Sequence, residues 1–304
     1  MNLKRLCLSV FFVVFPLFSL PSYGSSFLQP SQLRGKIKSD FSGVLHERGS
    51  EDVTLIGSIS PATFEIFKEI INTEPSVKNI YVDSQGGNIV SAISVAEMIH
   101  DHHLHLIVDG KCLSACANFL FVAAETKSVL PFSAVGIHEA FIRYKQNGSE
   151  KIASGNEAEG LLNDSKDYMA IEDLKKTKLK ESSFYPKFGI TPLLHKQFAD
   201  YISRRKYIFH NENHYENISY ESCPAIKAWA LNEAQLKSIG VKGILDFWYP
   251  QNNEERLALS SKLKIDVTAI YFGSSGNLEL MCTDRFSRLI LEPLYSVLST
   301  VKKI

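Results

Sequence analysis

Strand-like and helix-like hydrophobic patterns alternate along the first half of the chain. Short apolar runs that end at polar residues or glycine predict strands, and apolar residues three or four positions apart predict amphipathic helices. Strands that alternate with helices in this way indicate parallel βαβ units, and therefore an α/β fold. The predicted strands are 53–59, 79–84, 104–109, 129–131 and 134–138, and the predicted helices begin at 61 and span 89–100 and 115–124.

The second half of the chain is less regular. Residues 139–220 are more polar, and helices are predicted there at 171–180 and 193–208. Residues 250–304 form a C-terminal extension, for which the pattern predicts a strand at 267–272 and a helix at 285–298.

A short capped helix is predicted between these two regions. The segment from Trp229 has apolar residues at helical spacing, with Asn232 placed as an N-cap and Gly240 as the stop. Asparagine is favoured at the first position, and glycine after the last turn.

The N-terminus has the pattern of an export signal. Lys4 and Arg5 precede an uncharged apolar run at 6–20, and the small residues Ser22 and Gly24 suit cleavage after Gly24. A retained membrane anchor is the alternative, but the run is shorter than the roughly 20 residues that span a bilayer. We therefore expect an exported protein, periplasmic or secreted after cleavage.

Charge and composition exclude some partners. Lysine plus arginine equals aspartate plus glutamate, at 33 each, and no basic stretch stands out. A nucleic-acid-binding protein is expected to carry a basic patch, so nucleic acid is not a predicted partner.

The cysteines indicate a disulfide. Cys7 lies in the predicted signal, which leaves Cys112, Cys116, Cys223 and Cys282 in an exported protein. Four cysteines allow three complete pairings, and the sequence does not choose among them. A thiolate metal site normally has a second matching cysteine pair. None is present in the sequence, so no metal is predicted.

Three motifs together suggest a serine nucleophile, its base and an oxyanion hole. They are Val82-Asp-Ser-Gln-Gly-Gly-Asn88, Gly110-Lys-Cys-Leu-Ser-Ala-Cys-Ala-Asn-Phe-Leu-Phe121 and Ala134-Val-Gly-Ile-His138. A serine needs an adjacent base and backbone N–H groups that bind the developing oxyanion. Ser114 is the candidate nucleophile and His138 the candidate base. Alternatively, Ser114 only caps a helix and His138 is a core residue. A capping serine would not explain why a histidine motif and a glycine pair accompany it.

Four histidines in six residues, 100–105, could also bind zinc or copper. Their spacing matches no metal-site motif, and they fall between a predicted helix and a predicted strand. A solvent-facing loop is the preferred interpretation.

The chain resembles the proteolytic subunit of the Clp protease and, more broadly, the crotonase-like superfamily. It is most similar to exported ClpP-like proteins, and the resemblance covers roughly residues 55–243. Leu130-Pro-Phe-Ser-Ala-Val-Gly-Ile-His138 follows the family's Leu-Pro-x-Ser-x-Val-x-Ile-His pattern. The resemblance implies a ClpP/crotonase-like α/β fold of repeated βαβ units. The resulting division is a signal peptide at 1–24, a linker at 25–50, this domain at 51–249 and the extension at 250–304.

The resemblance also implies roles for individual residues. Ser114 matches the nucleophile, His138 the general base, and the amides of Gly87 and Ala115 the oxyanion hole. The family's third acid is missing, because the aligned position falls near Pro224. Glu221 is the candidate for that role and Glu216 the other nearby acid; a Ser–His dyad is the remaining possibility.

We therefore expect an ATP-independent serine hydrolase, a peptidase acting on peptides or unfolded segments. It should need no cofactor and no ATPase partner, and homo-oligomers are plausible because family members form rings or trimers. The alternative is a catalytically decayed binding or scaffold protein of the same fold. Two further alternatives are acyl-CoA chemistry and a serine–lysine dyad with Lys111 or Lys127 as base.

Overall fold

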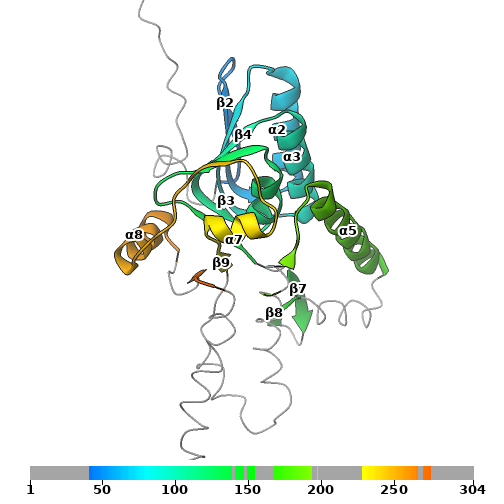
Figure 1. Ribbon diagram of the computed structural model, residues 1–304. Coiled ribbons are helices and arrows are strands. Elements are labelled where there is room, and N and C mark those ends of the chain that lie inside the picture. Colours follow the sequence, from blue (N-terminus) through cyan, green and yellow to red (C-terminus); the bar gives the residue numbers. More distant parts are fainter. Residues whose placement is uncertain are drawn as a thin grey trace, which may run out of the picture.

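A mixed nine-stranded sheet forms the centre of the molecule (Figure 1). The computed structural model describes residues 41–138, 141–146, 149–154, 168–193, 197, 228–265 and 270–274. The strands of this sheet are β1 (Gly43–His46), β2 (Asp52–Ile59), β3 (Asn79–Gly87), β4 (His105–Leu113), β5 (Thr126–Val129), β6 (Ala134–Ile137), β9 (Ala228–Ala230), β10 (Ile244–Phe247) and β11 (Ile270–Phe272).

The strand order is β1-β2-β3-β4-β6-β9-β11. Strands β2, β3, β4 and β6 run parallel, while β1 and β9 are antiparallel to their neighbours β2 and β6. The first part of β4 pairs with β5, and β5 pairs on its other side with β10. The last part of β4 pairs with β6. The sheet therefore divides at β4, where β5 and β6 begin separate branches.

Helices join the strands and cover the sheet (Figure 1). Helix α3 packs against α2, against the helix after β4, and against α5. A separate two-stranded hairpin follows β6. The helices are α2 (Pro61–Thr73), α3 (Ile89–Asp101), the π-helix η1 (Cys116–Phe121), α5 (Tyr168–Lys187), α7 (Glu233–Ser238) and α8 (Asn253–Leu263), and the hairpin strands are β7 (Phe141–Gln146) and β8 (Ser149–Ser154).

Local sequence signals explain where these helices begin. The Ser60 side chain accepts a hydrogen bond from the Thr63 amide at the start of α2, and Pro61 occupies the first turn. Asn88 caps α3 in the same way, by accepting from the Ser91 amide. A side-chain acceptor at the N-cap satisfies an amide that has no partner inside the helix.

The α/β prediction is confirmed. Apolar residues of β2, β3 and β4 form one core with the inner faces of α2 and α3. Parallel strands buried on both faces are expected to be apolar almost throughout, as 53–56 and 80–82 are. The side chains with no exposed surface in these elements include Val53, Leu55, Phe67, Ile80, Val82, Val95, Ile99, Leu106 and Val108.

Two strands of the sheet lie in segments that the sequence analysis placed outside the main domain. Strand β1 lies inside the segment 25–50, which was assigned to a linker. It pairs with β2 and forms an edge of the sheet. Strand β11 lies inside the predicted extension 250–304, yet it pairs with β9 in the main sheet. Some of the extension is therefore integral to the sheet. Residues 1–40 and 275–304 lie outside the described residues.

The capped helix predicted before Gly240 is confirmed as α7, and the residues that precede its cap form a strand. Trp229 and Ala230 belong to strand β9, and the helix α7 begins only after Asn232. Asn232 is the predicted N-cap, and with Gln235 it forms a capping box in which each side chain bonds the other residue's amide at 2.9 Å. Gly240 adopts φ +98° after the helix, as expected of a stop.

Candidate active site

Ser114 lies in the tight turn between β4 and η1. Its φ angle is +57°, a left-handed conformation that costs a non-glycine residue roughly 1–2 kcal/mol. Strained residues of this kind gather at functional sites, and a serine on a sharp strand-to-helix turn is how α/β-hydrolases expose their nucleophile. Ser114 is only partly buried, although Ala115 beside it is almost completely buried. The turn therefore displays the serine.

The structure brings the segments of Ser114 and His138 together. The Ser114 amide donates to the Gly136 carbonyl oxygen at 3.0 Å, and Leu113 is the register partner of Gly136 in the parallel β4–β6 pair. His138 comes directly after β6 and is partly buried. Both residues thus follow the carboxyl ends of adjacent parallel strands, the edge at which α/β proteins bind ligands.

The glycine pair reaches the same edge from β3. A Cβ placed on Gly86 would lie 2.6 Å from Ser114 Cβ and 2.7 Å from the Ala115 nitrogen. A Cβ on Gly87 would lie 2.1 Å from the Ile59 carbonyl oxygen. Real Cβ atoms do not approach other atoms so closely, so both positions require glycine. The three sequence motifs therefore meet at one place.

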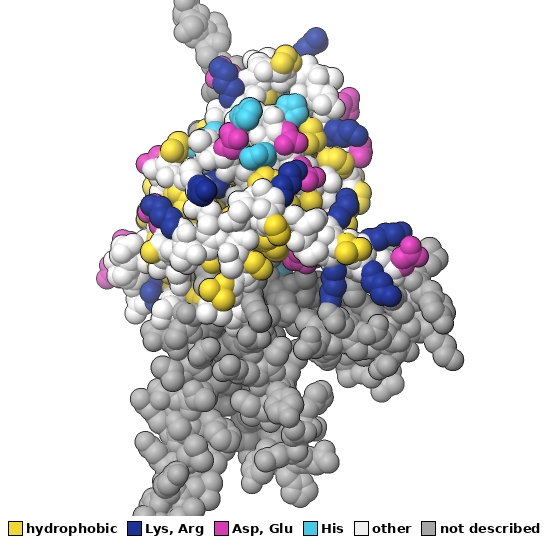
Figure 2. Space-filling view, turned by 45° about the vertical axis from the view of Figure 1, so that its right-hand side comes forward, with side chains coloured by type: hydrophobic (Ala, Val, Ile, Leu, Met, Phe, Trp, Pro, Cys, Tyr) yellow, Lys and Arg dark blue, Asp and Glu magenta, His cyan; other side chains and the backbone are white. Residues whose placement is uncertain are grey.

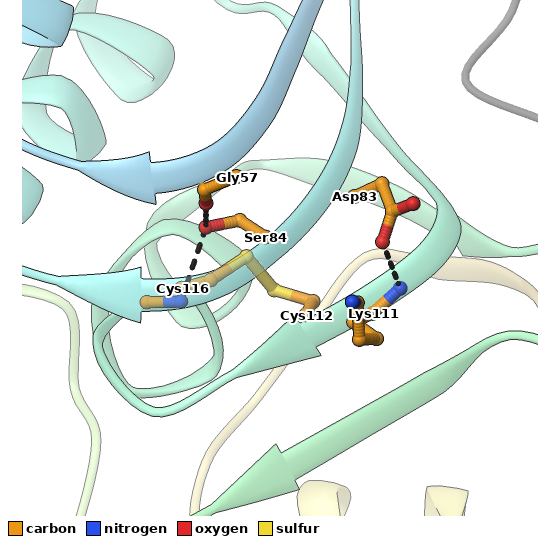
Figure 3. The surroundings of a disulfide bond; sticks show 7 residues. Gly57, Asp83, Ser84, Lys111, Cys112 and Cys116 are labelled. Atoms are coloured by element: carbon orange, nitrogen blue, oxygen red, sulfur yellow. Dashed lines mark hydrogen bonds between the residues drawn. A yellow bond between two sulfur atoms is a disulfide. The ribbon is translucent and has the colours of Figure 1, made fainter. Parts of the chain in front are cut away.

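A buried serine supports the glycine turn. Ser84 Oγ donates to the Gly57 carbonyl oxygen at 2.6 Å and accepts from the Gly86 amide at 3.1 Å (Figure 3). The Gly86 amide is thereby engaged within the protein. The family resemblance assigns the oxyanion role to Gly87 and Ala115, and this assignment stays a prediction.

A disulfide encloses the turn. Cys112 and Cys116 are bonded to each other, with Cα atoms 5.1 Å apart, and both are fully buried. Cys112 is the register partner of Ser84 across the β3–β4 pair, so the disulfide lies beside the glycine turn (Figure 3). This identifies one pair among the pairings that the sequence left open. Cys223 and Cys282 lie outside the described residues.

Asn118 is a site residue that the sequence analysis missed. Its backbone amide donates to the Ser114 carbonyl oxygen at 2.8 Å, and its side-chain Nδ2 donates to the His138 carbonyl oxygen at 3.1 Å. The only signal in the sequence was one amide inside an otherwise apolar helix. The helix itself is a π-helix, a rare form that is frequent at functional sites.

Lys127, one of the two lysines proposed as an alternative base, has another contact for its amine. Lys127 is 1% exposed, and its Nζ donates at 3.3 Å to the carbonyl oxygen of Val122, at the end of η1 remote from Ser114. Desolvation lowers the pKa of Lys127 to about 7. Lys111 is the other candidate, and its backbone N–H donates to Asp83 Oδ1 at 2.9 Å (Figure 3). The contacts of Lys127 do not support it as the base for Ser114.

Two histidines of the segment 100–105 form hydrogen bonds with other side chains. His103 Nδ1 bonds Glu125 at 2.8 Å, and this hydrogen bond lowers the pKa of the Glu125 carboxyl. His105 Nδ1 bonds Thr126 Oγ1 at 2.9 Å, and desolvation lowers the pKa of its ring. Figure 2 shows histidine side chains (cyan) beside acidic side chains (magenta) on one face of the molecule. Among the described residues, no group of three potential ligands could hold a metal ion.

Other predicted features fall outside the described residues. Glu216 and Glu221, the candidates for the third catalytic group, are among them. The same holds for the predicted signal peptide and for the helix at 285–298. Within the part of the chain that the structure describes, no helix is both long and apolar enough to cross a membrane.

Two of the solved structures that match this chain are proteases. One is a serine-to-alanine variant of the 1510-N membrane-bound stomatin-specific protease, 15% identical, with a TM-score of 0.37; the alignment covers 72% of this chain and 88% of that one. The other is a variant of ClpP1 from Listeria monocytogenes, 16% identical, with a TM-score of 0.33 and coverage of 67% and 94%.

No protein-family model matches the sequence, and no curated protein matches it either. The structural similarity scores are too low to support an argument about activity. What the site can do must therefore be inferred from its own geometry.

Proposed function

We propose that this chain is an exported, ATP-independent serine hydrolase that cleaves peptides or unfolded protein segments. The observation that carries the proposal is the left-handed turn at Ser114, bonded directly to the strand that leads into His138. A serine nucleophile needs an adjacent base, and His138 follows the strand to which the Ser114 turn is bonded.

In the proposed mechanism, Ser114 Oγ attacks the carbonyl carbon of a peptide bond, and His138 accepts the hydroxyl proton. The amides of Gly87 and Ala115 bind the oxyanion that forms. His138 then donates the proton to the leaving amine, and a water molecule releases the acyl group from Ser114 by the same steps.

The disulfide supports the proposed export. Cys112 and Cys116 are bonded to each other, and structural disulfides persist in oxidising compartments such as the periplasm or the extracellular space. An exported enzyme has no ATP supply, so an accessible, unfolded substrate suits this compartment better than a folded one.

Hydrolysis of unfolded substrates tests the proposal. The purified mature protein is incubated with a reduced, carboxymethylated protein and with the same protein in its folded form, without ATP. We expect fragments only from the unfolded substrate, and none with the Ser114→Ala variant. The proposal would be wrong if Ser114→Ala cleaved the unfolded substrate as fast as the wild type. It would also be wrong if the wild type cleaved neither the unfolded protein nor any member of a broad peptide library.

A further inference from the structure

Asn118 is a polar residue in an apolar setting. Its side chain is 6% exposed, and it lies in η1 among residues that belong to the hydrophobic core. Burying an amide is unfavourable unless its polar atoms form hydrogen bonds. Its neighbours in this helix, all of them buried, are Cys116, Ala117, Phe119, Leu120 and Phe121.

The hydrogen bonds of Asn118 connect the two proposed catalytic residues. Its backbone N–H donates to the Ser114 carbonyl oxygen, and its side-chain Nδ2 donates to the His138 carbonyl oxygen. His138 lies one residue beyond the end of β6, so the β4–β6 ladder does not extend to it. The side chain of Asn118 is therefore a fixed link between the nucleophile turn and the main chain of the base.

Stability alone does not explain an asparagine at this position. Its Oδ1 atom is buried and receives no hydrogen bond from any of the described residues. A buried acceptor without a donor is unfavourable, and an apolar residue of similar shape would avoid that cost. The hydrogen bond that the Asn118 side chain does form is the one from Nδ2 to the His138 carbonyl oxygen.

We propose that Asn118 is a positioning residue of the Ser114–His138 site. It keeps the main chain of His138 at a fixed distance from the turn that carries Ser114, so that the imidazole can reach the hydroxyl. This inference rests on the proposed hydrolase function and adds to it a third residue, Asn118, which acts through His138 and does not itself touch substrate.

The test compares rates of labelling by a fluorophosphonate probe, which reacts with activated serines. The full-length mature protein is compared with Asn118→Leu, which replaces the amide by an apolar group of similar shape. We expect labelling to fall by about tenfold to a hundredfold, since displacement of a catalytic group by about 1 Å has effects of this size. Thermal unfolding of each protein shows whether the variants are folded at the labelling temperature.

Two further variants separate positioning from stability. Asn118→Asp has almost the same shape, and only its protonated carboxyl can donate to the His138 carbonyl oxygen. Its labelling rate relative to the wild type should therefore recover as the pH falls. Phe67→Leu lowers stability from the buried face of α2, and we expect its labelling rate to equal that of the wild type.

The possible outcomes distinguish this inference from the proposed function. If the wild type is labelled, and Asn118→Leu and Asn118→Asp are labelled at the same rate as the wild type, the positioning role is overturned and the hydrolase proposal stays intact. If Asn118→Leu fails to fold, the pH dependence of Asn118→Asp decides, and a ratio that does not change with pH would overturn the inference. Absence of labelling in the wild type would overturn the proposed function, and the positioning role with it.

Discussion

Gly86 and Ser114 pack against each other without room for a further carbon atom. A Cβ on Gly86 would lie 2.6 Å from Ser114 Cβ, and the backbone of Gly86 has φ +90°. The glycine motif at the end of β3 and the serine motif at the end of β4 are therefore parts of one structure. The conformation of the turn at Ser114 depends on the absence of a side chain at Gly86.

Gly86→Ala should impair both stability and the reactivity of Ser114. The added methyl group must displace Ser114 and the Ala115 amide, and the positive φ adds backbone strain. We expect the free energy of unfolding to fall by about 3 kcal/mol. Fluorophosphonate labelling should fall by roughly a hundredfold when measured at a temperature at which the variant is folded.

Gly49→Ala is the matched control. Gly49 has a similar positive φ of +78°, but a Cβ there would meet nothing within 4 Å. Only backbone strain of about 1 kcal/mol is expected, with unchanged labelling. Equal labelling of the Gly86 and Gly49 variants would show that the close approach of Gly86 to Ser114 is unimportant.

The disulfide should hold the nucleophile turn in its reactive conformation. Replacing both Cys112 and Cys116 by alanine removes a very short closed loop, for which the chain-entropy treatment gives a loss of about 2 kcal/mol in stability. We expect slower labelling of Ser114 as well, because its left-handed φ is no longer constrained from both sides.

Reduction provides an independent check on the disulfide prediction. A strong reductant under mildly denaturing conditions should slow labelling of the wild type, and the double alanine variant should not respond. If the double variant labels as fast as the oxidised wild type, the disulfide contributes nothing to the reactivity of the turn.

Lys127 should make stability depend on pH. Burial lowers its pKa from 10.5 to about 7, so between these values the unfolded chain binds a proton that the folded protein does not. Stability rises with pH wherever the unfolded state binds more protons. This residue should therefore contribute an increase of about 2 kcal/mol in the free energy of unfolding between pH 7 and pH 9.

Urea unfolding at several pH values measures this contribution. The Lys127→Met variant keeps an apolar side chain of similar length and loses the titrating amine, so its stability should change less over this pH range. An identical pH dependence in wild type and variant would mean that Lys127 is not buried as the structure shows.

Most strands and helices between residues 52 and 138 could be predicted from the sequence because local and tertiary signals agree there. Buried parallel strand segments such as 80–82 are continuously apolar, and Ser60, Pro61 and Asn88 mark the helix starts. Further along the chain, tertiary pairing overrides the local pattern. Trp229 has helical spacing but lies in β9, where it is fully buried and its Nε1 donates to the Gly273 carbonyl oxygen at 3.0 Å.

The site was predicted in part, for a related reason. Ser114, His138 and the glycine pair could be found because their motifs are local in sequence. The left-handed angle of Ser114 and the 112–116 disulfide arise only when β3, β4 and β6 come together. The role of Asn118 depends on a hydrogen bond to a residue 20 positions away, and no sequence pattern identifies such a bond.

The most direct test of the account is whether Ser114 is an activated nucleophile. Purified mature protein would be labelled with a fluorophosphonate probe and the modified residue identified by peptide mass spectrometry, with Ser114→Ala and His138→Ala alongside. The account predicts a single adduct on Ser114 that is absent from Ser114→Ala and strongly reduced in His138→Ala. A folded, oxidised wild-type protein that remains unlabelled, or a label on another residue, would contradict it and favour a binding or scaffold protein of the same fold.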